Sequence, residues 1–317
     1  MLLNELLNIK YPIISGAMAN ITDGKFAACV SNAGGLGIIA SGGWNNEKLL
    51  EEIRICKSLT NKPFGVNVML MNPDVENIID VICSERVSVV TTGAGNPGIY
   101  IDKLNDAGCK VFPVIAGVAL AKRLSRYNIS GFIVEGTESG GHVGEATTMA
   151  LVPQVVAAVN VPVIAAGGIA SGQQINAAFA LGAIGVQVGT IMLASAECPI
   201  HDNYKQAVIK AKDSDTIVTG RSHNAPVRIL KNDMSRKYLE LESKVASRDE
   251  LEALTLGSLR RAVLEGDVAN GSLMMGQVAG MIHEVKPVSK ILSDLINEAI
   301  ANKTVLLEKI NKMEKIK

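Results

Sequence analysis

The stretch PVIAAGGIASGQQINAAFALGAIGVQVGT, residues 162–190, contains two apolar runs that each end in small or glycine residues. The runs cover 162–168 and 185–190, and a segment with helical patterning connects them. Parallel strands need such a crossover connection, and strands buried on both faces are continuously apolar. The stretch therefore predicts one strand–helix–strand unit of a parallel sheet that helices cover.

The same pattern recurs along the first 190 residues. Six further apolar runs, each ending in glycine or small polar residues, lie at 11–18, 36–41, 63–70, 87–95, 110–117 and 131–136. Between runs, segments such as NEKLLEEIRICKSL (46–59) and TTMALVPQVVAAV (147–159) place apolar residues at helical spacing. Eight such units are the number that closes a (β/α)8 barrel. We therefore predict an α/β fold of the TIM-barrel type.

An open, doubly wound sheet is the alternative for a chain of alternating strands and helices. That fold would place GxGxxG directly after the first strand, and SGAMAN (15–20) does not supply it. NAGGLG (32–37) has the glycines but precedes a strand, which is typical of a helix end and turn.

The composition changes after Thr190, and residues 197–285 are polar, charged and helical in pattern. We predict three units: a barrel over 1–196, a small helical substrate or lid subdomain over 197–285, and a C-terminal helix over 286–317. In that last segment five apolar residues share one helical face: Val288, Ile291, Leu292, Leu295 and Ile296. The C-terminal helix is therefore expected to pack back on the barrel.

Charge and composition exclude several classes of partner. The formal net charge is zero, which argues against nucleic acid. Residues 146–196 carry no charge, but prolines and amides interrupt them, so no membrane helix is expected.

The amino-terminal segment lacks the pattern of a signal peptide, which predicts a cytoplasmic protein. The five cysteines have no zinc-site spacing, and we predict no metal cluster.

The chemistry of such a barrel belongs at the carboxyl ends of its strands. The last two strand ends carry Gly167, Gly168, Gly189 and Thr190. Loops at these positions, with a helix N-terminus, are a common phosphate site. The two loops contain no lysine or arginine, so backbone dipoles and a hydroxyl would hold the phosphate. Tight strand–helix turns alone would also explain these glycines.

Seven motifs together carry a family resemblance. YPIISGAM, AGGLGII, KPFGVNVML, VVTTGAGNP, EGTESGGHVGE, PVIAAGGIASG and VQVGT stand in the order seen in the flavin-dependent enoyl-acyl-carrier-protein reductase II family. That family is part of the nitronate monooxygenase-like, or 2-nitropropane dioxygenase, flavoproteins. The likeness covers residues 1–190 and resumes at VANGSLMMGQVAG (268–280).

The resemblance implies bound FMN, with NADH or NADPH as co-substrate and a monovalent cation as a further cofactor. The implied cofactor-binding residues are Gly16, Ala17, Met18, Asn67, Gly93, Glu135, Gly140, Gly167, Gly168, Gly189 and Thr190. It also implies an acyl-carrier protein as partner, for which Lys231, Arg236 and Lys237 are a candidate dock, a solvated helix face being the alternative. The sequence leaves the oligomeric state open, with a homodimer among the alternatives.

His142 stands in the glycine-rich segment after the sixth strand run. Histidine can donate a proton or a hydrogen bond near neutral pH, but a lone histidine can equally cap a strand end. The resemblance assigns His142 to catalysis. Glu138 or Glu145 could orient it, although solvated loop carboxylates are the commoner outcome. His201, His223 and His283 are expected in a linker, a surface loop and a helix start.

The predicted reaction is hydride transfer from NAD(P)H through FMN to the β-carbon of a trans-2-enoyl thioester in fatty-acid elongation. The same family offers nitronate oxidation or quinone reduction as alternatives, and a non-catalytic flavin- or sugar-phosphate-binding barrel is a third. A cysteine nucleophile, as in inosine-monophosphate-dehydrogenase-like barrels, is disfavoured, because the loop after the sixth strand has His142 and no cysteine.

Overall fold

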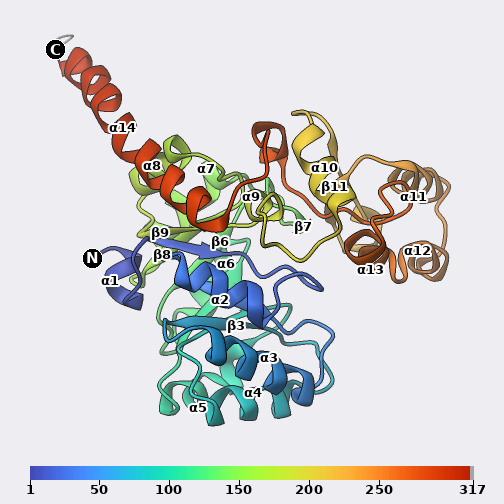
Figure 1. The fold of residues 1–317 in the computed structure, drawn as a ribbon, viewed down its shortest axis with the longest axis horizontal. Coiled ribbons are helices and arrows are strands. Elements are labelled where there is room, and N and C mark those ends of the chain that lie inside the picture. Colours follow the sequence, from blue (N-terminus) through green and yellow to red (C-terminus); the bar gives the residue numbers. More distant parts are fainter. Residues whose placement is uncertain (315–317) are drawn as a thin grey trace.

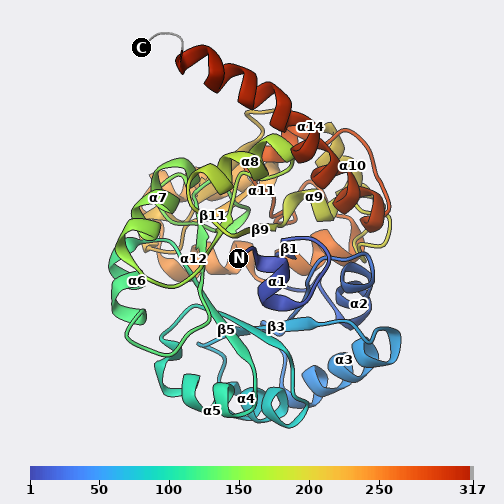
Figure 2. The ribbon, with the colours of Figure 1, turned by 90° about the vertical axis from the view of Figure 1, so that its left-hand side faces the viewer.

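The computed structural model describes residues 1–314, and eight parallel strands form its central barrel (Figures 1 and 2). The strands are β1 (Ile13–Ser15), β2 (Gly37–Ala40), β3 (Phe64–Met69), β4 (Val89–Gly93), β5 (Lys110–Ile115), β6 (Phe132–Glu135), β8 (Val163–Ala166) and β9 (Gly185–Val188). They pair in the order β1-β9-β8-β6-β5-β4-β3-β2. A parallel bridge between Ile14 and Leu36 joins the two ends of this order. The predicted (β/α)8 barrel is confirmed, and each predicted run contains one strand.

Helices surround the barrel and cover its outer face (Figure 2). They are α2 (Gly24–Asn32), α3 (Asn46–Leu59), α4 (Val75–Ser84), α5 (Ile101–Asp106), α6 (Val118–Leu124), α7 (Thr148–Ala158) and α8 (Gly172–Ala180), with a short 3-10 turn η1 at Pro97–Ile99. Side-chain caps fix where several begin: Asp23 accepts a hydrogen bond from the Phe26 N–H at 2.8 Å, and Asn45 accepts from Lys48 at 3.0 Å. Such caps satisfy backbone donors that the first helical turn leaves free.

The barrel interior is a packed apolar core. Ile14, Val89, Phe112, Ile133 and Ile164 fill it and are fully buried or nearly so. Helix α1 (Leu3–Leu7) closes the end at which the strands begin, where the Leu3 N–H donates to the Ile184 carbonyl at 2.8 Å. The open end is therefore the one at which the strands finish, as the sequence predicts for the site.

The chain after β9 forms a smaller body beside the barrel mouth (Figure 1). The short helix α9 (Thr190–Leu193) leads into it, and it contains α10 (Asp202–Lys210), α11 (Asp233–Ser243), α12 (Arg248–Thr255), α13 (Ser258–Arg260), a π-helical turn η3 (Arg261–Glu265), and 3-10 turns η2 (Arg221–His223) and η4 (Gln277–Met281). Its mostly helical content is confirmed. We keep residues 197–285 as the proposed extent of this subdomain.

A small sheet in the subdomain is the main feature that the sequence did not predict. Strands β10 (Thr216–Thr219) and β11 (Val227–Leu230) pair antiparallel, and β11 pairs antiparallel with β7 (Gly141–His142). Strand β7 has only two residues, which is too short a pattern to recognise. The third strand comes from the barrel loop after β6, so the sheet joins the subdomain to that loop.

Helix α14 (Val288–Glu314) ends the described chain. Val288, Ile291, Leu292 and Leu295 are buried and Ile296 is half-buried, and the helix packs against α8 and α2. The last three residues of the predicted unit 286–317 lie outside the described residues. Within residues 1–314, no helix combines the length and apolarity needed to cross a membrane.

Candidate active site

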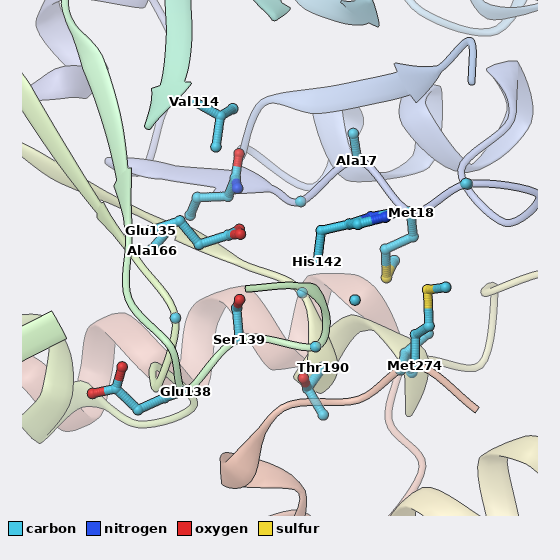
Figure 3. A pocket seen from close by; sticks show the side chains of 18 of the residues that line it. Ala17, Met18, Val114, Glu135, Glu138, Ser139, His142, Ala166, Thr190 and Met274 are labelled. Atoms are coloured by element: carbon cyan, nitrogen blue, oxygen red, sulfur yellow. The ribbon is translucent and has the colours of Figure 1, made fainter. Parts of the chain in front are cut away.

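A cavity of about 270 Å³ opens at the carboxyl ends of the barrel strands, between the barrel and the subdomain (Figure 3). Twelve of its lining residues are the predicted ones: Gly16, Ala17, Met18, Asn67, Gly93, Glu135, Gly140, His142, Gly167, Gly168, Gly189 and Thr190. They come from six strand ends that the barrel closure brings together. The structure thus places all twelve around one space, while their individual roles stay predictions.

Three glycines expose backbone around the cavity: Gly16 and Gly189 form one wall at the ends of the neighbouring strands β1 and β9, and Gly93 lies at the end of β4. A Cβ added at Gly93 or Gly189 would meet no atom within 4 Å, so these two face open space. The Gly16 N–H donates to the Val188 carbonyl at 2.8 Å, which holds the loop after β1 against the end of β9. The wall can therefore approach a flat ligand closely, because no side chain covers the backbone there.

Gly167 and Gly168, after β8, adopt left-handed backbone angles, with φ of 86° and 75°. A side chain at Gly167 would also lie 2.8 Å from the Gly136 carbonyl oxygen. Both position and angle thus demand glycine here. Among the described residues that line the cavity there is no lysine or arginine.

Backbone N–H groups at the start of α8, the helix that follows β8, already donate to side chains of the protein. The Gly172 N–H at the start of α8 donates to the Glu298 carboxylate at 3.0 Å, and the Gln174 N–H donates to Ser171 at 3.3 Å. Thr190 accepts a hydrogen bond from the Gly276 N–H at 2.8 Å, so its own hydroxyl hydrogen remains available. A phosphate would thus rest on the glycine backbone and Thr190 rather than on the α8 terminus.

The residues of the cavity fit a planar phosphorylated group. The Ser139 hydroxyl is buried at the wall and has no hydrogen-bond partner within the described chain, which is unusual for a buried polar atom. Asn67 donates to the Thr91 hydroxyl at 2.8 Å, which fixes its side chain beside the cavity. The glycine wall, the free Ser139 hydroxyl and the positioned amide together provide shape and polar contacts for a flavin.

Glu135 ends β6, and its carboxylate points into the cavity (Figure 3). Burial raises the pKa of Glu135 to about 7, and the nearby Ser139 hydroxyl acts in the opposite direction. Removal from water disfavours the charged form of a carboxylic acid. Near neutral pH this carboxyl can therefore exist either as a hydrogen-bond donor or as an anion.

His142 lies on β7, and its imidazole reaches across the cavity mouth toward Met18 (Figure 3). The strand pairs His142 with Val227 of β11, and the Val143 N–H donates to the Pro226 carbonyl at 3.1 Å. The side chain is exposed to solvent. This position combines access from solvent with a backbone that two strands hold.

Neither flanking carboxylate orients His142. Glu138 accepts hydrogen bonds from the Thr148 N–H at 2.9 Å and from its hydroxyl at 3.0 Å, which caps helix α7. Glu145 pairs with Arg221 of the subdomain. Both carboxylates thus stabilise the ends of the loop that carries His142.

Arg228 is a feature of the site that sequence reasoning missed. Only 6% of it is exposed, although no described carboxylate forms a salt bridge with it. Its Nε donates to the Thr137 carbonyl and its Nη1 to the Thr216 hydroxyl, both at 3.1 Å. Burial lowers the pKa of Arg228. The contact joins residues 91 positions apart, so no local pattern could have revealed it.

The subdomain also supplies an apolar wall. Leu259, Met274 and Val278 line the cavity, and the side chains of Met274 and Met18 point toward one another (Figure 3). Met274 and Val278 belong to the segment 268–280, which carries part of the family resemblance. That resemblance was the one feature of the sequence that could have placed these two residues at the site. A chain of methylene groups could lie between these two methionines.

The other candidate residues lie away from the cavity. His201 caps α10 by accepting from the Asn203 N–H at 3.1 Å, and His223 lies beside Ser222 in the turn η2. Lys231, Arg236 and Lys237 are exposed at and near α11. Burial raises the pKa of Cys109 to about 11 and of Cys198 to about 12, so neither thiol is a reactive nucleophile.

Comparisons with known proteins agree on one family. The profile of the family described as nitronate monooxygenase matches residues 1–80 and 74–298. A structure of FabK from Thermotoga maritima is 46% identical with a TM-score of 0.94, covering 97% of this chain and 98% of that one. A probable nitronate monooxygenase of Staphylococcus aureus is 30% identical, covering 93% of this chain and 96% of its own length. A (3aS,4S,5R,7aS)-5-hydroxy-7a-methyl-1-oxo-octahydro-1H-indene-4-carboxyl-CoA dehydrogenase of Rhodococcus jostii is also 30% identical, with 94% and 95% coverage.

Proposed function

This chain belongs to the nitronate monooxygenase family and is a flavin oxidoreductase, and on that premise we propose that it is an FMN-dependent enoyl-acyl-carrier-protein reductase. The observation that carries the proposal is that His142 and the glycine wall line the same cavity. A proton donor and a bare backbone wall in one cavity are what reduction of a conjugated thioester by a bound flavin requires. The similarity to FabK supports the reductase branch.

FMN, when bound, would take a hydride from NADH or NADPH and give it to the β-carbon of the enoyl thioester. The backbone of Gly167, Gly168 and Gly189, with the Thr190 hydroxyl, would hold the phosphate. Asn67, Glu135 and Ser139 would contact the polar edge of the ring system. A monovalent cation completes the proposed set of cofactors.

His142 would complete the reduction on the substrate side. Addition of a hydride at the β-carbon leaves negative charge over the α-carbon and the thioester carbonyl. The imidazole can protonate the α-carbon or donate a hydrogen bond to the carbonyl oxygen, and such help contributes about 10²–10⁴-fold to a rate. The acyl chain would lie between Met18 and Met274, the apolar side of the cavity.

An acyl-carrier protein is the proposed bearer of the substrate. These carriers are acidic, and the exposed Lys231 and Lys237 offer a basic surface on the subdomain. Arg236 is less available, since it pairs with Asp233.

Nitronate oxidation is the second candidate, because the staphylococcal relatives carry that name at 30% identity. The two reactions separate in one experiment on the purified flavoprotein. Without oxygen, consumption of NADH or NADPH should depend on a crotonyl thioester and yield the butyryl thioester, identified by mass spectrometry. If oxygen uptake with an alkyl nitronate is fast and crotonyl thioester is not reduced, nitronate oxidation is the correct function.

A further inference from the structure

Glu135 places a carboxyl group in the cavity without a basic partner. Its side chain is half-buried, and the exposed part faces the cavity (Figure 3). Its register partner on β8 is Ala166, and β5 contributes Val114 to the same cavity, so the neighbouring strands offer no charge. Because no described lining residue is a lysine or arginine, a negative charge on Glu135 has nothing there to balance it.

Two other titratable side chains line the cavity, Glu138 and His142. The Glu138 carboxylate is held at the start of α7, where it accepts from the Thr148 N–H and hydroxyl. The imidazole of His142 is exposed at the cavity mouth. Every other described residue that the strand ends and the subdomain contribute to the lining is uncharged. A dependence of ligand binding on pH would therefore have few sources within the cavity.

The polar groups near Glu135 are neutral. The Ser139 hydroxyl is buried without a hydrogen-bond partner, the Asn67 amide donates to Thr91, and Gln187 lines the cavity from β9. Such groups can donate to a carboxylate or accept from a carboxylic acid, so they tolerate either form. Burial decides between the two, and it raises the pKa of Glu135 to about 7 in the flavin-free protein.

We propose that Glu135 takes up a proton when the flavin binds and then donates a hydrogen bond to an acceptor atom at the edge of the ring system. This inference rests on the flavin site of the proposed function. A ligand that fills the cavity removes the remaining water from the carboxyl group. FMN also brings the negative charge of its phosphate into a cavity whose described lining has no lysine or arginine. Both effects destabilise a carboxylate relative to the neutral acid.

The consequence is an affinity for FMN that depends on pH. At pH values below about 7 the free protein already carries the proton on Glu135, so the dissociation constant should be constant. At higher pH each binding event must take a proton from solvent, and the dissociation constant should rise about tenfold per pH unit. The phosphate group of FMN is already ionised in this range, since its second pKa is about 6, and it adds little slope.

Titration of the flavin-free, full-length protein with FMN tests this linkage, with flavin fluorescence as the signal. Between pH 7 and 9 the dissociation constant of wild type should rise roughly 50-fold. Glu135→Gln keeps the shape and a neutral hydrogen-bond donor, so its dissociation constant should stay constant. His142→Gln is the matched control, because it removes the titratable group at the mouth, and it should keep the wild-type slope.

Three results of that titration would overturn the proposal. A constant affinity in wild type would mean that binding takes up no proton. An affinity that increases with pH would show that Glu135 acts as an anionic acceptor. A slope that persists in Glu135→Gln would assign the proton to another group.

Calorimetric titrations at pH 8, in two buffers with different ionisation enthalpies, count the protons directly. Wild type should take up about one proton per FMN, and Glu135→Gln should take up none. Release of protons by wild type, or no exchange at all, would contradict the proposal. Failure of the proposed reaction has a different signature: a protein that binds FMN with this proton uptake but does not reduce crotonyl thioester is not an enoyl reductase, and the role of Glu135 stands.

Discussion

His142, the candidate proton donor, pairs across two strands with Val227, a residue of the subdomain. The loop that carries His142 leaves the barrel at β6, but its backbone is fixed by β11. Barrel and subdomain therefore jointly determine where the imidazole lies. A displacement of the subdomain would move His142 relative to the cavity wall.

Replacement of His142 tests its chemical role. The variant His142→Ala should bind flavin normally, because the phosphate wall lies elsewhere in the cavity, and should lose about 10²–10⁴-fold in turnover. Flavin content and steady-state reduction of crotonyl thioester measure the two effects. Full turnover in His142→Ala would eliminate the histidine as proton donor.

Arg228 is expected to act as a positioning residue for His142. Arg228→Met removes the hydrogen bond to the Thr137 carbonyl, and turnover should fall about 10- to 100-fold through misplacement of the loop. Arg228→Lys, which keeps the charge, should recover part of that loss.

A double-variant cycle distinguishes positioning of His142 by Arg228 from a general disruption of the fold. In a His142→Ala background, Arg228→Met should cost little further turnover, because the group that it positions is already gone. Equal losses in both backgrounds would show that Arg228 acts independently of His142.

The phosphate wall can be tested at Gly168. Its positive φ makes any side chain strained there, a Cβ would lie 3.3 Å from the Glu138 side chain, and a carboxylate would also repel phosphate. Gly168→Asp should therefore purify without flavin. Gly108→Asp is the control, since Gly108 also has a positive φ, of 83°, but is exposed and remote from the cavity. Flavin retained in Gly168→Asp would contradict the assignment of the wall.

The raised pKa of Glu135 predicts that the stability of the fold depends on pH. Its pKa rises from 4.5 to about 7 in the folded chain, so the folded state binds more protons than the unfolded state between these values. Stability of the flavin-free protein should therefore fall as pH rises from about 4.5 to 7, by up to about 3 kcal/mol. Urea unfolding at several pH values should show this slope in wild type but not in Glu135→Gln. Identical slopes would mean that Glu135 titrates normally.

The barrel and its cavity could be predicted because each depends on local signals. Apolar runs ending in glycine identify strands, and parallel closure brings their ends together, so residues such as Gly16 and Gly189 necessarily meet. The order of motifs then identified the flavin family. Both inferences need only residues close in sequence and one general rule of topology.

The subdomain contacts could not be predicted in this way. Strand β7 has two residues, and its pairing with β11 joins segments about 85 positions apart, without a periodic pattern. The hydrogen bond of Arg228 to Thr137 and the capping of α7 by Glu138 are likewise tertiary. Glu138 is close to His142 in the sequence, but its carboxylate accepts hydrogen bonds from Thr148 at the start of α7 instead.

Anaerobic stopped-flow of the two half-reactions tests the central claim most directly. The flavin should bleach on mixing with NADH or NADPH, and its absorbance should return on mixing the reduced protein with crotonyl-acyl-carrier protein. That return should be at least as fast as steady-state turnover and should slow strongly in His142→Ala. A reduced flavin that crotonyl thioester leaves bleached, and that only oxygen or a quinone reoxidises, would contradict the enoyl reductase assignment.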